Sequence, residues 1–172
     1  MTGQLDGSTR RRSFVTAALA ALAVSPALAH GQNKEKSEMS LDLVHLNPDT
    51  MHRNPAFSQG VIIPPGLRTL IIGGQNAVDA RGEIVGKGDI AAQTAQALDN
   101  LVKVLEAAGG SLDNLVRVGL LLRHDADLQA GFGAWMARAG SLRNPPTVTA
   151  AFVNRLAVPD YLIEIEATAV LP

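Results

Sequence analysis

The sequence contains no cysteine, which excludes disulfides, zinc-thiolate sites and thiol nucleophiles. Aromatic residues make up only 3% of its 172 residues, too few for the stacking platforms of single-strand nucleic-acid binders. Charge of neither sign dominates, because 15 basic residues face 16 acidic ones. A protein without a basic patch is not expected to bind nucleic acid. Because no disulfide can form, the stability of the fold must come from packing or from assembly.

The common catalytic and metal-binding motifs are also missing. The chain has no nucleophile elbow, phosphate-binding loop or dinucleotide fingerprint. Glycines 82, 86 and 88 have the spacing of turn residues and lack the strand-turn-helix context of a phosphate loop. The four histidines show no metal-ligand spacing. They are His30, His45, His52 and His124. We therefore expect neither a metal nor a cofactor.

The amino-terminal segment predicts export. Three arginines at 10–12 precede Ser13-Phe14 and an alanine-rich apolar run from Val15 to Val24, which is too short for a resident membrane helix. Ala27-Leu28-Ala29 fits a cleavage site, so residues 1–29 are predicted to be a signal peptide. The twin arginine before an apolar pair is more typical of a Tat signal than of a Sec signal, the alternative. Either route predicts a periplasmic protein in a bacterium.

After the leader, one domain is expected. Residues 30–39 are polar and predict a disordered spacer, which leaves residues 40–172 for the domain. The whole chain is 47% hydrophobic and 18% charged, enough to bury one core. Strands are predicted at 41–46, 115–122, 148–153 and 162–170, and helices at 89–108 and 127–139. This order fits an α+β sheet with both helices packed on one face. The other face is then either solvated or covered by another subunit.

Two further apolar runs, 59–63 and 69–75, are separated by Pro64-Pro65-Gly66 and predict a β-hairpin. The second run ends in Gly73-Gly74. Glycine weakens a strand unless it serves a bulge or a close approach to the backbone. A ligand or a neighbouring chain near Gly74 and a simple bulge are both compatible with this pattern.

The last predicted strand carries two carboxylates on one face. Side chains alternate along a strand, so Glu164 and Glu166 share a face with Leu162 and Thr168. Neighbouring carboxylates repel each other, so two of them side by side are unusual on a strand face that only has to be soluble. A solvated sheet face and a catalytic face both remain possible interpretations of this pattern.

Four segments in matching order resemble the Rid family, also called YjgF, reactive intermediate deaminase or endoribonuclease L-PSP. They are Asn54–Gly60, the Gly73-Gly74-Gln75 strand end, the helix from Gln93-Thr94 to Leu101, and Ile163–Ala167. The resemblance runs from about Leu43 to the carboxyl terminus. It implies a chorismate-mutase-like mixed sheet, with two helices on one face, that assembles as a homotrimer with ligand clefts between subunits.

The resemblance also implies an activity, the hydrolysis of 2-imino and enamino acids to 2-keto acids and ammonia without cofactor or metal. In these enzymes an arginine binds the substrate carboxylate and a glutamate of the last strand activates water. Glu166 matches this catalytic glutamate, Gly74 matches a cleft glycine, and Phe57 stands where many members have tyrosine. The substrate-binding residues implied here are Phe57, Ser58, Gly73, Gly74, Val148, Thr149 and Ala150.

The arginine of the family pattern is absent. The family's Pro-Ala-Arg-Ser segment corresponds to Pro146–Thr149, which places Val148 at the arginine position. Valine cannot form the bidentate, charge-assisted pair that arginine forms with a carboxylate. The loss of that pair weakens carboxylate binding by about a hundredfold. Arg143 and Arg155 lie nearby in sequence. They either supply the charge from another position or, as their loop positions favour, are solvated surface residues.

Two functions follow from this resemblance. The first is hydrolysis of an imine, an enamine or a related reactive metabolite, with Glu166 positioning water. The alternative is a trimer of the same fold that binds a small molecule without turnover, in an apolar cleft bounded by Phe57, Val148 and Phe152, or that acts as a chaperone-like holder. The expected partners are a small-molecule ligand and further copies of the chain, with no nucleic acid and no membrane after signal cleavage.

Overall fold

The computed structural model describes residues 41–140, 142 and 144–172 of the chain. The predicted signal peptide, residues 1–29, and the predicted spacer, residues 30–39, lie outside the described residues. Across the described part, none of the helices is long and apolar enough to cross a membrane.

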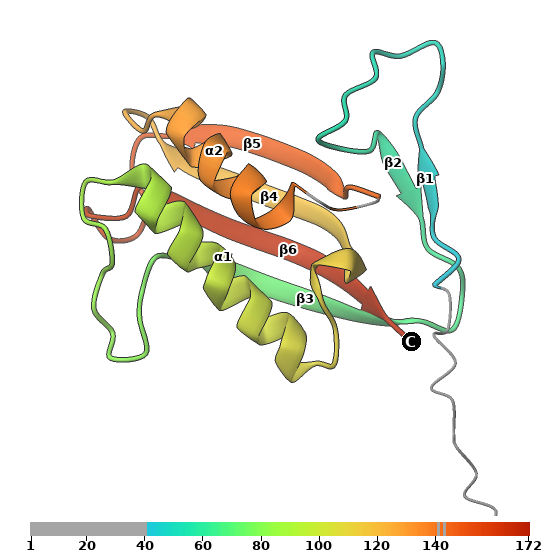
Figure 1. Cartoon of the computed structure of the whole chain (residues 1–172), viewed down its shortest axis with the longest axis horizontal. Helices are drawn as coiled ribbons and strands as arrows, with labels where there is room; N and C mark the ends of the chain where they lie inside the picture. The colour runs from blue at the N-terminus through green and yellow to red at the C-terminus, as the bar shows by residue number, and fades with distance from the viewer. Residues whose placement is uncertain (1–40, 141, 143) are drawn as a thin grey trace, which may run out of the picture. The chain divides into compact units, whose positions relative to one another are not determined.

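Four strands form the central sheet in the order β3-β6-β4-β5 (Figure 1). They are β3 (Arg68–Gln75), β4 (Leu115–Arg123), β5 (Thr147–Val153) and β6 (Ile163–Leu171). β6 is antiparallel to both of its neighbours, whereas β5 is parallel to β4. Parallel strands need a long crossover, and the connection from β4 to β5 supplies one that contains a helix. The sheet is therefore mixed.

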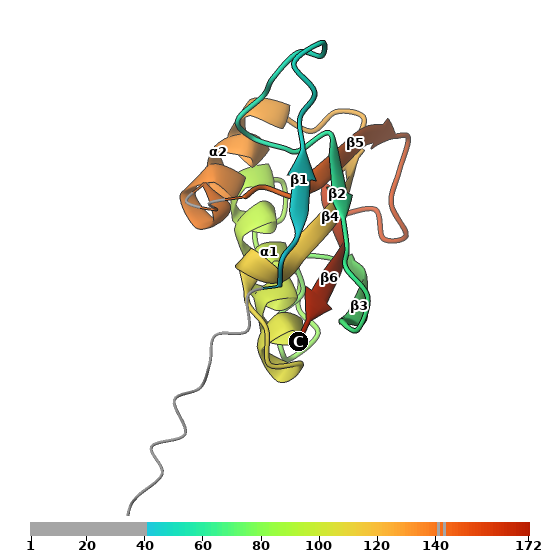
Figure 2. The same cartoon turned by 90° about the vertical axis from the view of Figure 1, so that its right-hand side faces the viewer.

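Both predicted helices form, and both cover the same face of the sheet (Figure 2). They are α1 (Ile90–Ala107) and α2 (Leu128–Ala139), and a short 3-10 helix, η1 (Leu112–Asn114), precedes β4. Asp89 caps α1 by accepting hydrogen bonds from the backbone N–H groups of Ala91 and Ala92, and Asp127 caps α2 in the same way. The predicted α+β fold with two helices on one face is confirmed.

The core lies between α1 and the sheet. Leu98, Leu101 and Leu105 form a stripe along α1, and each is at most 1% exposed. They belong to one buried cluster with Val118 of β4 and Ile165 of β6. Burying an aliphatic side chain of this size contributes about 1.5–3 kcal/mol, so this layer holds α1 firmly on the sheet.

The predicted hairpin between residues 59–63 and 69–75 is wrong. β2 (Gly60–Ile62) pairs with β1 (Val44–Leu46) in a separate two-stranded sheet, and β3 pairs with β6. The Pro-Gly turn shows only that the chain changes direction. β3 instead forms an edge of the central sheet, where its buried residue Ile72 packs in the same core cluster as residues of β6.

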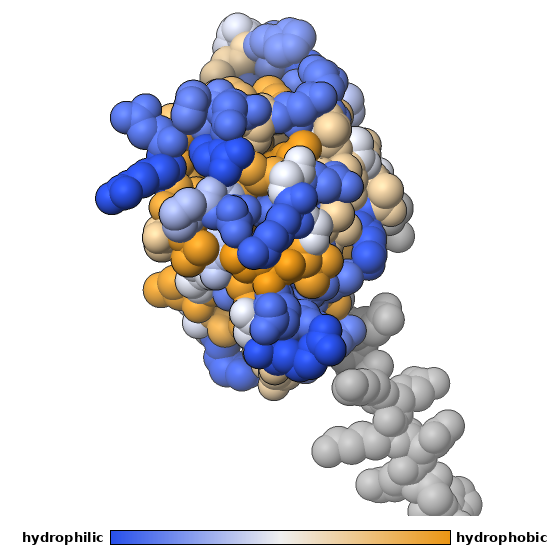
Figure 3. Space-filling view, turned by 90° about the vertical axis from the view of Figure 1, so that its left-hand side faces the viewer, coloured by the Kyte–Doolittle hydropathy of each residue, from blue (hydrophilic) through white to orange (hydrophobic). Residues whose placement is uncertain are grey.

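Some large apolar side chains stay at the surface. Ile71, on the side of β3 away from the helices, is 80% exposed, and Phe152 of β5 is 54% exposed. Figure 3 shows apolar side chains reaching the surface between polar ones at one end of the molecule. Single exposed apolar side chains are common on protein surfaces, so these two residues by themselves identify no interface.

Candidate ligand pocket and the opposite face of the sheet

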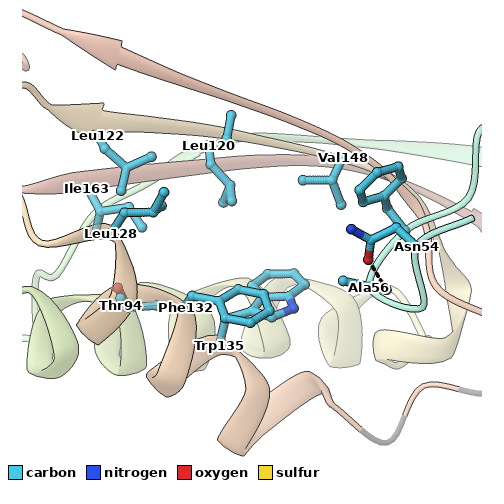
Figure 4. A pocket seen from close by; sticks show the side chains of 13 residues that line it. Asn54, Ala56, Thr94, Leu120, Leu122, Leu128, Phe132, Trp135, Val148 and Ile163 are labelled. Carbon is cyan, nitrogen blue, oxygen red and sulfur yellow. Dashed lines mark hydrogen bonds between the residues drawn. The ribbon is translucent and has the colours of Figure 1, made fainter. Parts of the chain in front are cut away.

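A pocket of about 230 Å³ lies between α2 and the helix-facing side of β4 and β5 (Figure 4). Leu120 and Leu122 of β4 line it together with Val148 and Ala150 of β5. The register explains this wall. Leu120 pairs with Ala150 and Leu122 with Phe152, and side chains two residues apart on a strand share a face.

The pocket exists because α2 packs against α1 and leaves part of β5 uncovered. Gly131 of α2 permits this close approach, since a Cβ atom there would lie 3.2 Å from the Cγ1 atom of Ile90 on α1. Phe132, the residue after Gly131, and Trp135, one turn further along α2, form the aromatic wall. The uncovered strip of β5 thus becomes the opposite wall.

A loop before β2 supplies the third wall and carries Phe57. The loop is tied to the start of β5 through Ser58, whose backbone N–H donates to the carbonyl of Pro146 at 3.0 Å. The Ser58 hydroxyl donates to the carbonyl of Pro145 at 2.7 Å and lies 3.0 Å from Nδ1 of His45. Because the hydroxyl proton goes to the carbonyl, the imidazole N–H donates to Ser58. Ser58 therefore holds Phe57 in place from behind the pocket.

The pocket is almost entirely apolar. Within the described residues, none of the side chains that line it is ionisable, and Val148 is among them. Two lining side chains are polar, those of Asn54 and Thr94. The Asn54 side-chain oxygen accepts a hydrogen bond from the backbone N–H of Ala56 at 2.8 Å. An ionised carboxylate placed here would find no charged partner.

Glu166 lies on the opposite face of the sheet. It pairs with Gly119 of β4, and its Oε1 accepts a hydrogen bond from Nη1 of Arg117 at 3.0 Å. Both side chains of this ion pair are 48% exposed. A Cβ atom on Gly119 would lie 2.6 Å from the same Oε1, so the carboxylate rests directly over the glycine backbone. The result is an oriented and accessible carboxylate.

Glu164 occupies an equivalent position over β3. A Cβ atom on Gly74 would lie 1.9 Å from its Oε1, and the Asn76 amide donates to its Oε2 at 3.4 Å. The register of β3 with β6 also shifts between Ile72 and Gln75. Gly74 therefore serves both as part of a bulge and as the place where a carboxylate side chain crosses the backbone.

Residues 50–171 match the family model for endoribonuclease L-PSP. The chain belongs to this family. It is 42% identical to a RutC family protein of Pyrococcus horikoshii over 101 residues, which cover 58% of this chain and 77% of that protein. The rat 2-iminobutanoate/2-iminopropanoate deaminase is 36% identical over 67 residues, 39% of this chain and 47% of that enzyme.

Solved structures agree. A Rid family protein of Yersinia pestis, 38% identical, superposes with a TM-score of 0.67 and covers 75% of this chain and 98% of its own. The YjgF gene product of Escherichia coli, 31% identical, has a TM-score of 0.55 over 67% of this chain and 87% of its own. The resemblance to the Rid family is confirmed, and it supports a deaminase-like or small-molecule-binding role.

The structure does not bring all the expected site residues of this Rid family protein together. Phe57, Val148 and Ala150 line the pocket, with Ser58 behind them. Gly74 and Glu166 lie on the outer face of the sheet. The rest stand apart from the pocket: Gly73 is exposed on β3, Thr149 precedes Ala150 and so points to the outer face, and Arg155 is exposed after β5. Arg143 lies outside the described residues.

Sequence reasoning missed Arg117 as the partner of Glu166. A signal was present, because Arg117 and Gly119 interrupt an apolar strand at a spacing of two and so share one face. Only the register of β4 with β6 sets them beside Glu166. The expectation that Leu162 shares a face with Glu164 and Glu166 is wrong. Leu162 precedes β6, is 4% exposed and belongs to the core cluster.

Proposed function

We propose that this Rid family protein binds a neutral, largely apolar small molecule in the pocket beside α2. The observation that carries the proposal is the uncharged lining of the pocket, which includes Val148 at the position where the family resemblance implies an arginine. Burying a carboxylate without a charged partner costs roughly several kcal/mol. An imino acid carries such a carboxylate and therefore fits this lining poorly. An apolar cavity of about 150 Å³ holds a benzene molecule. A pocket of about 230 Å³ can therefore hold a larger ring system.

The test compares two ligands of the same ring size by calorimetry, neutral 2-acetonaphthone and anionic 2-naphthoate. We expect the ketone to bind at least about tenfold more tightly, because only the carboxylate has to lose its hydration without a partner. Ala150→Phe fills the pocket and should abolish binding. Ala151→Phe, which points to the other face, is the matched control once its oligomeric state is verified. Tighter binding of naphthoate would overturn the proposal.

Hydrolysis of a neutral imine or enamine is a second candidate, and Glu166 favours it. Its carboxylate is half exposed and held by Arg117, so it can accept a proton from water. In one chain it faces away from the pocket, so this candidate includes assembly. We propose a homotrimer in which Glu166 of one subunit approaches the pocket of the next.

Ammonia release distinguishes the two candidates. The mature chain is mixed with freshly generated neutral enamines and with 2-imino acids, and its sedimentation is measured in the same buffer. Hydrolysis predicts release from the neutral enamines that Glu166→Gln lowers by about a hundredfold or more. Ligand-induced stabilisation without ammonia release supports binding alone, and a monomer in sedimentation removes the trimer.

We also propose that residues 1–29 direct export to the periplasm by the Tat route. The support is the Arg11-Arg12 pair before Ser13-Phe14. Replacing both arginines of the pair with lysine should leave the protein in the cytoplasmic fraction. Undiminished export of the variant would instead indicate the Sec route.

A further inference from the structure

Two neighbouring polar residues of α1 are buried, and they differ in how their polar atoms are satisfied. Gln93 is 0% exposed and fully paired: its Nε2 donates to the carbonyls of Asp160 at 2.8 Å and Gly86 at 3.2 Å, and its Oε1 accepts from the N–H of Leu162 at 2.8 Å. Thr94 is 1% exposed, and its Oγ1 has no hydrogen-bond partner among the described residues. Buried hydroxyls are normally paired, so Thr94 calls for an explanation.

The unpaired hydroxyl lies at the pocket. Thr94 lines it from the α1 side, and Figure 4 shows its oxygen at the helix-side floor, across from the wall formed by Ile163 and Leu122. Oγ1 lies close to Gly131 of α2, where a Cβ atom would come within 3.4 Å of it. The hydroxyl is almost fully buried in an otherwise apolar floor, so a small shift of a lining side chain would let a polar group of a bound molecule pair with it.

We propose that Thr94 recognises one uncharged hydrogen-bonding group at the buried end of the ligand. A threonine hydroxyl both donates and accepts, so a hydroxyl or a ring nitrogen suits it equally. The pocket then selects a ring compound that is apolar except for such a group at the end nearest α1. Because Thr94 acts only on a molecule that enters the pocket, this role rests on the proposed function.

The experiment measures the binding of naphthalene, 2-naphthol and quinoline to the wild-type chain and to Thr94→Val. Valine keeps the shape of threonine and removes the hydroxyl, while Thr94→Ser keeps the hydroxyl and serves as the control. The measured quantity is the ratio of the Kd of naphthalene to that of each polar probe. We expect Thr94→Val to lower this ratio by about threefold to tenfold and Thr94→Ser to preserve it. The general difference in hydrophobicity between the probes cancels in this comparison.

The outcomes separate the two proposals. If all three probes bind and the ratio is the same in wild type and Thr94→Val, the role of Thr94 is wrong while the proposed function stands. If none of the probes stabilises or binds the wild-type chain, the proposed function fails and the role of Thr94 fails with it. Thr94→Ala supplies a second variant without the hydroxyl, and a preserved ratio in a folded Thr94→Ala protein would also overturn the role.

Discussion

On the helix side of the sheet the pocket leaves the buried hydroxyl of Thr94 without a partner, whereas on the outer side both carboxylates of β6 have one. The helix side carries the largely apolar pocket. The outer side is charged and accessible, and Glu166 there faces away from the pocket of its own chain. The Rid pattern thus consists of two parts that this sequence keeps on separate faces. In the proposed function, ligand binding uses the first part, and the hydrolysis candidate needs both.

The largest expected effect concerns the paired neighbour of Thr94. Gln93→Met leaves the N–H of Leu162 and two backbone carbonyls without partners, and we expect it to lower the free energy of unfolding by about 3 kcal/mol. Thr94→Val, the control on the same helix, removes only an unpaired hydroxyl and should cost nothing. Urea unfolding measures both. A larger loss for Thr94→Val would show that the hydroxyl is paired after all.

Val148→Arg tests whether the apolar wall alone excludes anions. A charge-assisted hydrogen bond contributes about 1.5–3 kcal/mol, so we expect 2-naphthoate to bind the variant about tenfold to a hundredfold more tightly than it binds the wild type. Val148→Leu, which keeps the wall apolar, should show no gain. Calorimetry measures the two affinities. An unchanged affinity in a folded Val148→Arg protein would mean that another feature of the pocket rejects carboxylates.

Gly74→Ala tests the close approach on the outer face. The new Cβ atom overlaps the end of the Glu164 side chain, which must leave Asn76 for another rotamer at a cost of about 0.5–1 kcal/mol. Gly73→Ala is the matched control, since a Cβ atom there meets nothing within 4 Å. Equal melting temperatures of the two variants would contradict the contact.

Glu166→Gln should have the smallest effect on the folded chain. The ion pair with Arg117 is exposed, so we expect a stability change of at most about 1 kcal/mol. Binding of 2-acetonaphthone should stay within about twofold if the ligand contacts only the pocket of one chain, from which Glu166 faces away. The homotrimer proposed above, in which Glu166 approaches the pocket of the next subunit, predicts a larger loss. Thermal melting and calorimetry measure these quantities. A large loss of affinity would place Glu166 in a pocket shared between subunits.

Local features of the fold could be predicted from the sequence, and the pairing of distant segments could not. The caps at Asp89 and Asp127 mark the helix starts because the capping interaction spans only three residues. The prediction of a hairpin between residues 59–63 and 69–75 was wrong because the residues of a turn do not determine which strand pairs with which. The same reason explains the site. Phe57 and Val148 were expected in the cleft, but the pairing of Glu166 with Arg117 depends on the register of two strands far apart in sequence.

The sequence by itself determined the family, the α+β class and the two helices, because each depends on residue types in a fixed local order. Only the tertiary structure decided that Glu166 and the pocket lie on opposite faces of the sheet, and that Thr94 is buried without a partner while Gln93 is not. Those facts depend on how α2 rests on α1 and on how β6 enters between β3 and β4. The free energy of packing selects such contacts over the whole chain at once.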